Sequence, residues 1–413
     1  MNAQDWLASL DPIGWRFGLE RIKALLAASG DPQLAFESVH VVGTNGKSSV
    51  TQMTAALLEE SGKTTGAYLS PHTERWAERV RIGGAEVSAE DFERAVGAIA
   101  ALVPDVENGF QGGERVTQFE AATAAAFVAL CDAGVEVGVI EAGLGGRLDA
   151  TNVLESKVTV LTSIGLDHTQ WLGETEAEIA AEKLAVLRPG TKLVLGDLPP
   201  EIEAQARAHA EGLGAEVVQP QTSATTSDRP YSRTFDAEAP YLRRNLVVAV
   251  AAAEAFLGGS LGDDAVARAL RTLELPGRFE LKEGDPPVVR DAAHNPHGAQ
   301  ALAEALREHI GDRPVVACLA ILADKDAAAI VQALAPVLSA AVVTEIPSER
   351  LEGAGRPGTS SVPMVELGRL CEAAGLPTEA ILDPSEALAW TLARVKEANG
   401  VALVAGSHYL LSY

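Results

Sequence analysis

A phosphate-binding loop is predicted from the stretch V-V-G-T-N-G-K-S-S at residues 41–49. Gly43 and Gly46 let the backbone turn tightly, so that its N–H groups can face phosphate oxygens. Lys47 supplies a positive charge for terminal phosphates, and Ser48 offers a hydroxyl to Mg²⁺. A valine stands where the standard GxxxxGK[ST] pattern has its first glycine, so the loop is of a shorter type. The alternative is an ordinary strand-to-helix turn with a surface lysine.

Three further polar motifs follow apolar stretches that are predicted to be strands. Ser70 ends one such stretch, Glu141 directly follows the strand at 135–140, and Asp167-His168 follows the strand at 158–162. Ligands of open α/β sheets bind at the carboxyl ends of the strands, so we expect these motifs on one rim with the phosphate loop. Mg²⁺ prefers one or two carboxylates together with phosphates and waters, which suits Glu141.

Each of these residues also has an ordinary structural explanation. Glu141 alone could be a solvated residue at a strand end, and Asp167-His168 could be a helix cap beside a hydrogen-bonded histidine. Lys183 lies on an Ala-rich predicted helix and could be exposed. Arg147 and Asp149 could form a turn salt bridge that contributes little free energy.

A second pair of candidate residues, Asp291 and His294, lies at a predicted strand-to-helix turn near the C-terminal end. They could hydrogen-bond a ribose or a phosphate. Asp291 could instead cap the helix that begins after Pro296, and for the pair considered alone this is the favoured interpretation.

The elements that must position these residues alternate between strand and helix, which predicts an α/β fold with parallel sheets. We expect a P-loop ATPase-like N-terminal domain with a mostly parallel sheet at residues 1–282. A smaller Rossmann-like α/β domain is expected at 283–413, after a hinge at L-P-G-R-F-E. A helix is predicted at 13–28 and a polar surface loop at 219–233.

Composition and charge exclude several classes of protein. The 413 residues allow two or three domains, and the net charge of −24 argues against binding to nucleic acid or to an anionic membrane. The N-terminus lacks the basic and apolar regions of a signal peptide, and no apolar stretch approaches the length of a membrane span. The three cysteines lack metal-ligand spacing, which favours a reducing compartment. We expect a cytoplasmic monomer, because no surplus apolar helix is evident.

The motifs taken together resemble the folylpolyglutamate synthase/dihydrofolate synthase family, a branch of the Mur ligases. The resemblance rests on the phosphate loop, S-P-H with E-R-V-R-I-G-G, E-A-G-L-G-G-R-L-D-A-T-N, S-I-G-L-D-H-T-Q-W-L-G, A-A-E-K, L-P-G-R-F-E and D-A-A-H-N-P-H-G-A. Their order and spacing agree from about residue 13 to the C-terminus. Ala292 and Gln118 depart from the family, which usually has glycine and commonly an aromatic residue at these positions.

The resemblance implies an ATP-dependent ligase that joins L-glutamate to dihydropteroate, to folyl-polyglutamates, or to both. The substrate carboxylate would attack the γ-phosphate of ATP and become an acyl phosphate, which the glutamate amine would then displace. Charge on the transferring group would be met by Lys47 and two Mg²⁺ ions.

The family's functional residues carry over onto matching positions of this chain. ATP contacts are implied at Gly43, Thr44, Asn45, Gly46, Lys47, Ser48, Asn245, Arg278, Asp291 and His294, the last two from the second domain. Metal ligands are implied at Ser48, Ser70, Glu141, His168 and a carbamylated Lys183, with Lys47, His168 and Lys183 taking part in catalysis. Substrate contacts are expected at Phe119, Arg147, Asp149 and Ser407: Phe119 could stack on the pterin, Asp149 could bind its amino-pyrimidine edge, and Ser407 would border the glutamate site. Phe119 could equally be a core residue, and Asp149 a turn residue.

Two other functions remain as alternatives. A cell-wall amino-acid ligase of the same superfamily would carry a UDP-binding domain before its phosphate loop, and only 42 residues precede Gly43. A P-loop ATPase without ligase activity would need neither the additional metal ligands nor a second domain.

Replacing Lys47 tests the phosphate loop. Lys47→Ala is expected to lower turnover on the order of 10³-fold, because it removes a charge that stabilises the transferring phosphoryl group. The measurement is phosphate release with saturating ATP, with a thermal unfolding curve as the control for folding. Turnover like that of the wild type would remove the loop from the mechanism.

Overall fold

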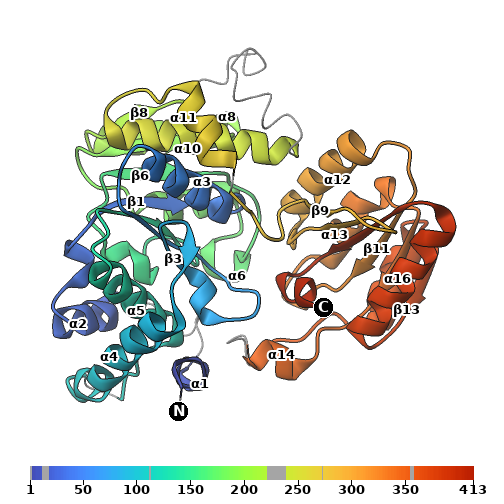
Figure 1. The fold of residues 1–413 in the computed structure, drawn as a ribbon, viewed down its shortest axis with the longest axis horizontal. Helices are drawn as coiled ribbons and strands as arrows, with labels where there is room; N and C mark the ends of the chain where they lie inside the picture. The colour runs from blue at the N-terminus through green and yellow to red at the C-terminus, as the bar shows by residue number, and fades with distance from the viewer. Residues whose placement is uncertain (1, 12–17, 111–112, 221–238, 272, 354–357) are drawn as a thin grey trace. The chain divides into compact units, whose positions relative to one another are not determined.

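The computed structural model describes residues 2–11, 18–110, 113–220, 239–271, 273–353 and 358–413. Within them the chain forms two compact units, each built on its own β-sheet (Figure 1). The first unit comprises Met1–Gly165, Thr169–Ala237 and Arg244–Leu273, and the second comprises Leu166–His168, Glu238–Arg243 and Glu274–Tyr413.

The described part of the first unit contains an eight-stranded sheet in the order β4-β3-β2-β5-β1-β6-β7-β8. The strands are β1 (Glu37–Val42), β2 (Thr65–Tyr68), β3 (Val80–Ile82), β4 (Ala85–Glu86), β5 (Val137–Glu141), β6 (Val158–Leu161), β7 (Lys192–Leu195) and β8 (Glu216–Val218). In sheet order, the pairings along β2-β5-β1-β6-β7-β8 are all parallel. β3 pairs antiparallel with β2, and β4 pairs antiparallel with β3 at the edge of the sheet. The predicted mostly parallel sheet is therefore confirmed.

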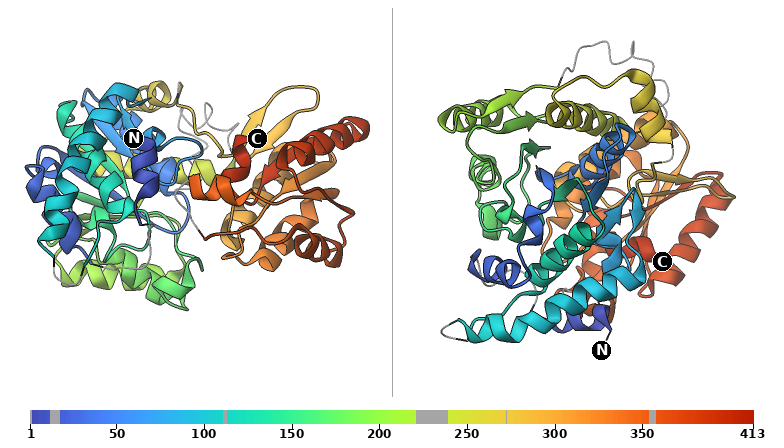
Figure 2. Two further views of the ribbon diagram at one scale, coloured as in Figure 1. Left: turned by 90° about the horizontal axis from the view of Figure 1, so that it is seen from below. Right: turned by 60° about the vertical axis from the view of Figure 1, so that its left-hand side comes forward.

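Helices cover this sheet and supply its cores. They are α1 (Ala3–Ser9), α2 (Glu20–Ala28), α3 (Lys47–Glu60), α4 (Ala89–Asn108), α5 (Gln118–Asp132), α6 (Thr169–Leu172), α7 (Glu176–Leu184), α8 (Pro200–Gly212), α10 (Pro240–Leu257) and α11 (Asp263–Arg271). Ile22, Ile99 and Phe127 belong to a core cluster around α2, α4 and α5, and Ile179 and Leu193 to another beneath α7 and α8. In Figure 2, α4 and α5 run beside each other.

Two predicted segments lie partly outside the described residues. The helix expected at 13–28 is described only from Glu20, because residues 12–17 are not described. The polar loop expected at 219–233 lies almost entirely within 221–238, which is also outside the description.

The described part of the second unit contains a six-stranded sheet in the order β13-β12-β11-β14-β10-β9. Its strands are β9 (Glu280–Lys282), β10 (Val288–Arg290), β11 (Val315–Leu319), β12 (Ala340–Val343), β13 (Thr378–Ala380) and β14 (Val401–Ala405). The helices are α12 (Pro296–Ile310), α13 (Ala327–Leu334), α14 (Ser348–Gly353), α15 (Met364–Ala373) and α16 (Pro384–Ala398). Only β9 pairs antiparallel, so the predicted smaller α/β domain is confirmed as a fold.

The long C-terminal segment of the second unit begins at Glu274, whereas the second domain was expected from residue 283. The reason is that β9 pairs with β10 and so belongs to the second sheet. Among the described residues, no helix has both the length and the apolar character needed to cross a bilayer.

Candidate active site

The predicted phosphate loop connects β1 to α3. Gly46 precedes α3 at φ 83°, and Gly43 has φ 152°, both in the region that favours glycine. A Cβ atom at Gly43 would collide with the hydroxyl of Thr162, and one at Gly46 would lie 2.7 Å from Oδ1 of Asn245. Both glycines are therefore needed for close packing, and the predicted ATP contact Asn245 does lie beside the loop.

The loop is tied to the segment that follows β6. The Thr44 amide donates to the carbonyl of Ser163 (2.8 Å), and the Asn45 amide donates to its hydroxyl (3.0 Å). The Thr44 hydroxyl lies 3.1 Å from the carbonyl of Gly165. Lys47 bends back so that Nζ donates to the carbonyl of Thr44 (3.1 Å). The loop conformation thus depends on two strand ends rather than on one.

Glu141 contacts two of the other predicted metal ligands, Ser48 and Ser70. Its side chain is 1% exposed at the end of β5. Oε1 accepts from the Ser48 hydroxyl (3.0 Å), and Oε2 accepts from the backbone amide of Ser70 (3.1 Å). Glu141 is therefore not a solvated residue at a strand end. The structure brings Ser48, Ser70 and Glu141 together.

Lys183 also reaches the phosphate loop. It is 4% exposed on α7, and its Nζ donates to the carbonyl of Gly43 (2.8 Å). A Cβ atom at Gly146 would lie 2.6 Å from the carbonyl of Glu182, so the glycine lets the turn after β5 pack against α7. The alternative of an exposed surface lysine is wrong.

Asp167 and His168 form a charged cluster within the second unit. Lys325 donates to Oδ1 of Asp167 (2.7 Å) and lies 3.2 Å from Nε2 of His168. Asn295 donates to the other Asp167 oxygen (3.0 Å), and His294 lies 3.7 Å from it. Burial alone would raise the pKa of Asp167, but His168, Lys325 and His294 outweigh it and hold that pKa well below its ordinary value.

Both histidines of this cluster are neutral at pH 7. Burial, reinforced by the charge of Lys325, lowers the pKa of His168 to about 3 and that of His294 to about 4. Nδ1 of His294 lies 2.8 Å from the carbonyl of Ala292. His168 has φ 51°, which is uncommon for a residue other than glycine.

Asp291 is buried at the end of β10 and does not cap the helix after Pro296. Its carboxylate accepts from the Tyr241 hydroxyl (2.6 Å) and from the amides of Phe279 and Ala293 (2.8 Å each). Burial raises its pKa, although these hydrogen bonds and the charge of Arg278 oppose that shift. The cap is Asn295, whose side chain accepts from the Gly298 amide.

The two remaining predicted residues of the second unit make local contacts. Nη1 of Arg278 donates to the carbonyl of Gly277 (3.0 Å). The Ser407 hydroxyl accepts from the Tyr409 amide and caps the short helix His408–Ser412. The ring of His408 lies 5.2 Å from that of His294, which brings the C-terminal segment to the same cluster.

Phe119 and Asp149 take the positions expected of a core residue and a turn residue. Phe119 is 5% exposed, stacks on Tyr68 at 6.2 Å between ring centroids, and fills the space a side chain at Gly143 would need. Asp149 accepts from the amides of Leu144 (2.8 Å) and Thr151 (3.0 Å). Burial raises the pKa of Asp149, and its hydrogen bonds oppose the shift. Their substrate contacts stay predictions.

The alternative of a turn salt bridge between Arg147 and Asp149 is not observed in the structure. Arg147 is half exposed, and its Nε donates to Glu182 on α7 (2.8 Å).

A buried histidine continues the hydrogen bonding of Asp149 into the sheet. The Thr151 hydroxyl donates to Asp149, so it must accept its second hydrogen bond from Nε2 of His40, at 2.8 Å. His40 is fully buried in β1. Burial and the charge of Arg188 lower its pKa to about 3. This arrangement links the strand before the phosphate loop to the turn after β5.

Sequence reasoning missed His40 and Lys325. Lys325 stands between two aspartates shortly after β11, so the strand-end argument that found Asp167 could have found it. His40 gave no signal, because an isolated histidine within an apolar strand has no pattern.

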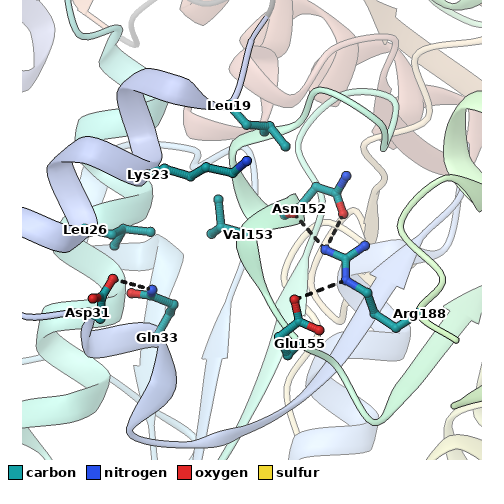
Figure 3. Close-up of a pocket in the computed structure, with 9 residues that line it drawn as sticks. All are labelled: Leu19, Lys23, Leu26, Asp31, Gln33, Asn152, Val153, Glu155 and Arg188. Carbon is teal, nitrogen blue, oxygen red and sulfur yellow. Dashed lines mark hydrogen bonds and ion pairs between the residues drawn. The ribbon is translucent and has the colours of Figure 1, made fainter. Parts of the chain in front are cut away.

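A cavity of about 330 Å³ in the first unit lies apart from these residues (Figure 3). It is lined by Leu19, Lys23, Leu26, Asp31, Gln33, Asn152, Val153, Glu155 and Arg188. Arg188 donates to the carbonyl and side-chain oxygen of Asn152 (2.9 and 3.0 Å) and lies near Glu155. None of the predicted site residues lines it.

Comparisons with known proteins identify the chain's relatives. The family described as Mur ligase, glutamate ligase domain, matches residues 277–408. The dihydrofolate synthase/folylpolyglutamate synthase of Mycobacterium tuberculosis is 35% identical over 364 residues, which cover 80% of this chain and 75% of that protein.

Two solved structures are similar over almost the whole chain. Mycobacterium tuberculosis folylpolyglutamate synthase complexed with ADP superposes with a TM-score of 0.87 and 31% identity. The match covers 96% of this chain and 94% of the chain in that structure. The bifunctional folylpolyglutamate synthase/dihydrofolate synthase with Mn, AMPPNP and L-glutamate bound has a TM-score of 0.81 and 28% identity, covering 100% and 97%. The bifunctional folylpolyglutamate synthase/dihydrofolate synthase of Yersinia pestis complexed with AMPPNP and Mn ion also has a TM-score of 0.81, with 27% identity.

The lowered pKa of His40 makes stability depend on pH. The native state keeps this ring neutral down to about pH 3, whereas in the unfolded chain the ring is protonated with the ordinary histidine pKa of 6.5. Neutral His40 therefore contributes to the free energy of unfolding above pH 6.5, and this contribution is lost as the pH falls from 6.5 toward 3. Between pH 7 and pH 5 the loss is roughly 1–2 kcal/mol.

The measurement is urea unfolding of the wild type and of His40→Gln at pH 7 and pH 5. The variant is expected to lose less stability over this interval, because glutamine does not titrate. The matched control is His209→Gln, which replaces an exposed histidine on α8. An equal pH dependence for His40→Gln and the wild type would contradict the assignment.

Proposed function

We propose, because this chain belongs to the dihydrofolate synthase/folylpolyglutamate synthase family of ATP-dependent ligases, that it joins L-glutamate to both dihydropteroate and reduced folates. The observation that carries the proposal is the junction of Ser48, Ser70 and Glu141 beside the loop that Lys183 also contacts. An ATPase without ligase activity would not need these additional groups.

The phosphate loop binds the phosphates of ATP in this proposal. Its backbone amides and the N-terminus of α3 face the phosphate oxygens, and Lys47 turns from the Thr44 carbonyl toward the γ-phosphate. Asn245, which lies against Gly46, adds an amide contact. Arg278, Asp291 and His294 are further proposed ATP contacts.

The oxygen donors around Glu141 fit Mg²⁺. One carboxylate and one or two hydroxyls suffice for this ion, because phosphates and waters complete its six positions. No group of three or more His, Cys, Asp or Glu side chains suited to a metal occurs among the described residues, which agrees with so sparse a set of protein ligands. We assign Ser48, Ser70 and Glu141 to one ion, and Glu141, His168 and Lys183 to a second. Bound Mg²⁺ supplies charge that offsets the negative charge developing on the γ-phosphate.

The chemistry then consists of two displacements. The substrate carboxylate attacks the γ-phosphorus, ADP leaves, and an acyl phosphate forms. The amine of L-glutamate attacks the acyl carbon, phosphate leaves, and an amide bond forms. Phe119 and Asp149 are proposed to hold the pterin, Arg147 to contact the substrate, and Ser407 to border L-glutamate. The proposed enzyme acts as a monomer in the cytoplasm.

The substrate assignment is tested with purified protein, ATP and L-glutamate. Dihydropteroate and tetrahydrofolate are offered separately, and the glutamylated products are identified by mass spectrometry. We expect product from both, since one pterin site serves both substrates. Product from tetrahydrofolate alone would restrict the enzyme to polyglutamate synthesis. ATP hydrolysis with neither substrate glutamylated would contradict the proposed function.

Lys183 is proposed to carry a carbamate. A carbamate turns a cation into an anion able to bind a metal, which explains a lysine buried beside a phosphate loop. Labelling with ¹³C-bicarbonate is expected to give a carbamate resonance in the carbon NMR spectrum, and removing bicarbonate should lower activity reversibly. Lys183→Gln should lose the resonance.

The matched control for this labelling is Lys192→Gln. Lys192 is half-buried, and like that of Lys183 its Nζ donates to a carbonyl, that of Ala255 (2.9 Å). Its variant should keep the resonance. An identical spectrum for the wild type and Lys183→Gln would rule out a carbamate at this position.

A further inference from the structure

Arg79 is a buried guanidinium that has no acidic partner in the described part of the chain. It lies at the end of the short helix Trp76–Arg79 and is 6% exposed. Among the described residues, no carboxylate oxygen lies within 4.0 Å of its nitrogens. Burying an unpaired cation is costly, so such a residue is expected where a ligand supplies the missing charge.

The acidic residues near Arg79 in sequence are engaged elsewhere. The carboxylate of Glu78 accepts from the backbone amides of Thr73, Glu74 and Arg75, at 2.7–3.0 Å. Glu86 accepts from the Arg75 guanidinium (3.0 Å). These carboxylates therefore neutralise Arg75, and none of the acidic residues that the structure describes neutralises Arg79.

Neutral groups hold Arg79 in one orientation. Its Cζ lies 4.1 Å from the ring centroid of Trp76, and its Nε donates to Nδ1 of His72 (2.9 Å). These contacts use the face and one edge of the guanidinium. In the described part of the chain no carboxylate contacts the two terminal nitrogens, which are the pair that binds a carboxylate in a fork. The indole N–H of Trp76 is also buried without an acceptor in the described part of the chain.

The position of Arg79 lies between the proposed pterin and metal sites. The Tyr68 hydroxyl interacts with the guanidinium, and the Tyr68 ring stacks on Phe119. The Arg79 carbonyl accepts from the amide of Leu69 (2.8 Å), and the next amide, that of Ser70, donates to Glu141. A substrate whose ring lies near Phe119 would direct its carboxylate past Arg79 toward the phosphates.

We propose that Arg79 binds the carboxylate of the pteroyl substrate. This inference rests on the proposed function and names a specificity-determining residue for it. The carboxylate must approach a negatively charged γ-phosphate in a protein whose net charge is −24. A guanidinium already fixed by Trp76 and His72 offsets that repulsion and orients the oxygens without losing side-chain freedom.

The test compares two ligands that differ only in the carboxylate. Dihydropteroate and its carboxamide are titrated calorimetrically against the full chain without ATP. The wild type is expected to bind the carboxylate about 10–100-fold more tightly, as for a charge-assisted hydrogen-bonded pair. In Arg79→Gln this ratio should fall to about one. A purely structural role would weaken both ligands equally and leave the ratio unchanged.

The matched control is Arg81→Gln. Arg81 lies two residues later on β3, and its guanidinium donates only to the carbonyl of Gly84 among the described residues, so the ratio should be that of the wild type. Arg79→Lys keeps the charge but not the fork and should give an intermediate ratio, which provides a second test if the glutamine variant does not fold.

The test separates a failure of this inference from a failure of the proposed function. A wild type that binds both ligands equally, or an Arg79→Gln that keeps the full ratio, overturns this inference alone. A wild type that binds neither ligand overturns the proposed function as well.

Discussion

Parallel pairing between β1 and β5 is the constraint on which the site depends. The register aligns Val41 with Glu141, so the carboxylate leaves the sheet at the level where the phosphate loop begins. Because both strands run the same way, the last residue of one and the loop of the other share an edge. Glu141 then needs no long side-chain reach to contact Ser48, and Ser70 arrives from β2 on the other side.

The sheet also explains why so many polar groups tolerate burial here. Glu141, Asp149 and His40 are almost fully enclosed, and each has at least one hydrogen-bond partner. A polar group buried in this way costs little only while its partners remain in place. The turn after β5, the strand β1 and the phosphate loop are consequently interdependent, and a change in one alters the hydrogen bonding of the others.

The fold was predictable because its signals are local. Apolar runs such as Val135–Ile140 and the glycines that follow mark a strand and its turn, and the repeated alternation of strand and helix patterns suffices for an α/β assignment. Glu141 and Lys183 were found as candidates in the same way, through motifs at strand ends and on a helix. Burial could not be foreseen: the sequence did not indicate whether Lys183 faces solvent or the loop, and only packing against Gly146 decides it.

Residues that act through distant partners were the ones missed. Lys325 meets Asp167 across more than a hundred residues of chain, and no spacing rule relates them. His40 likewise contacts Thr151, a residue more than a hundred positions away in the chain. Arg79 belongs to the quoted motif E-R-V-R-I-G-G, yet the absence of a carboxylate partner for it among the described residues becomes evident only when the positions of Glu78 and its neighbours are known.

The close contact between Gly43 and Thr162 restricts how the chain can vary. A Cβ atom at Gly43 would collide with the threonine hydroxyl, and one at Gly196, on the far side, would collide with the threonine carbonyl. The residues that follow β1, β6 and β7 therefore pack so closely that neither glycine has room for an added methyl group. The obstacle at Gly196 is a backbone carbonyl that every residue at position 162 carries, so this glycine is fixed by the fold itself even though it contacts no proposed ligand, whereas an alanine at position 43 would first require the loss of the threonine hydroxyl.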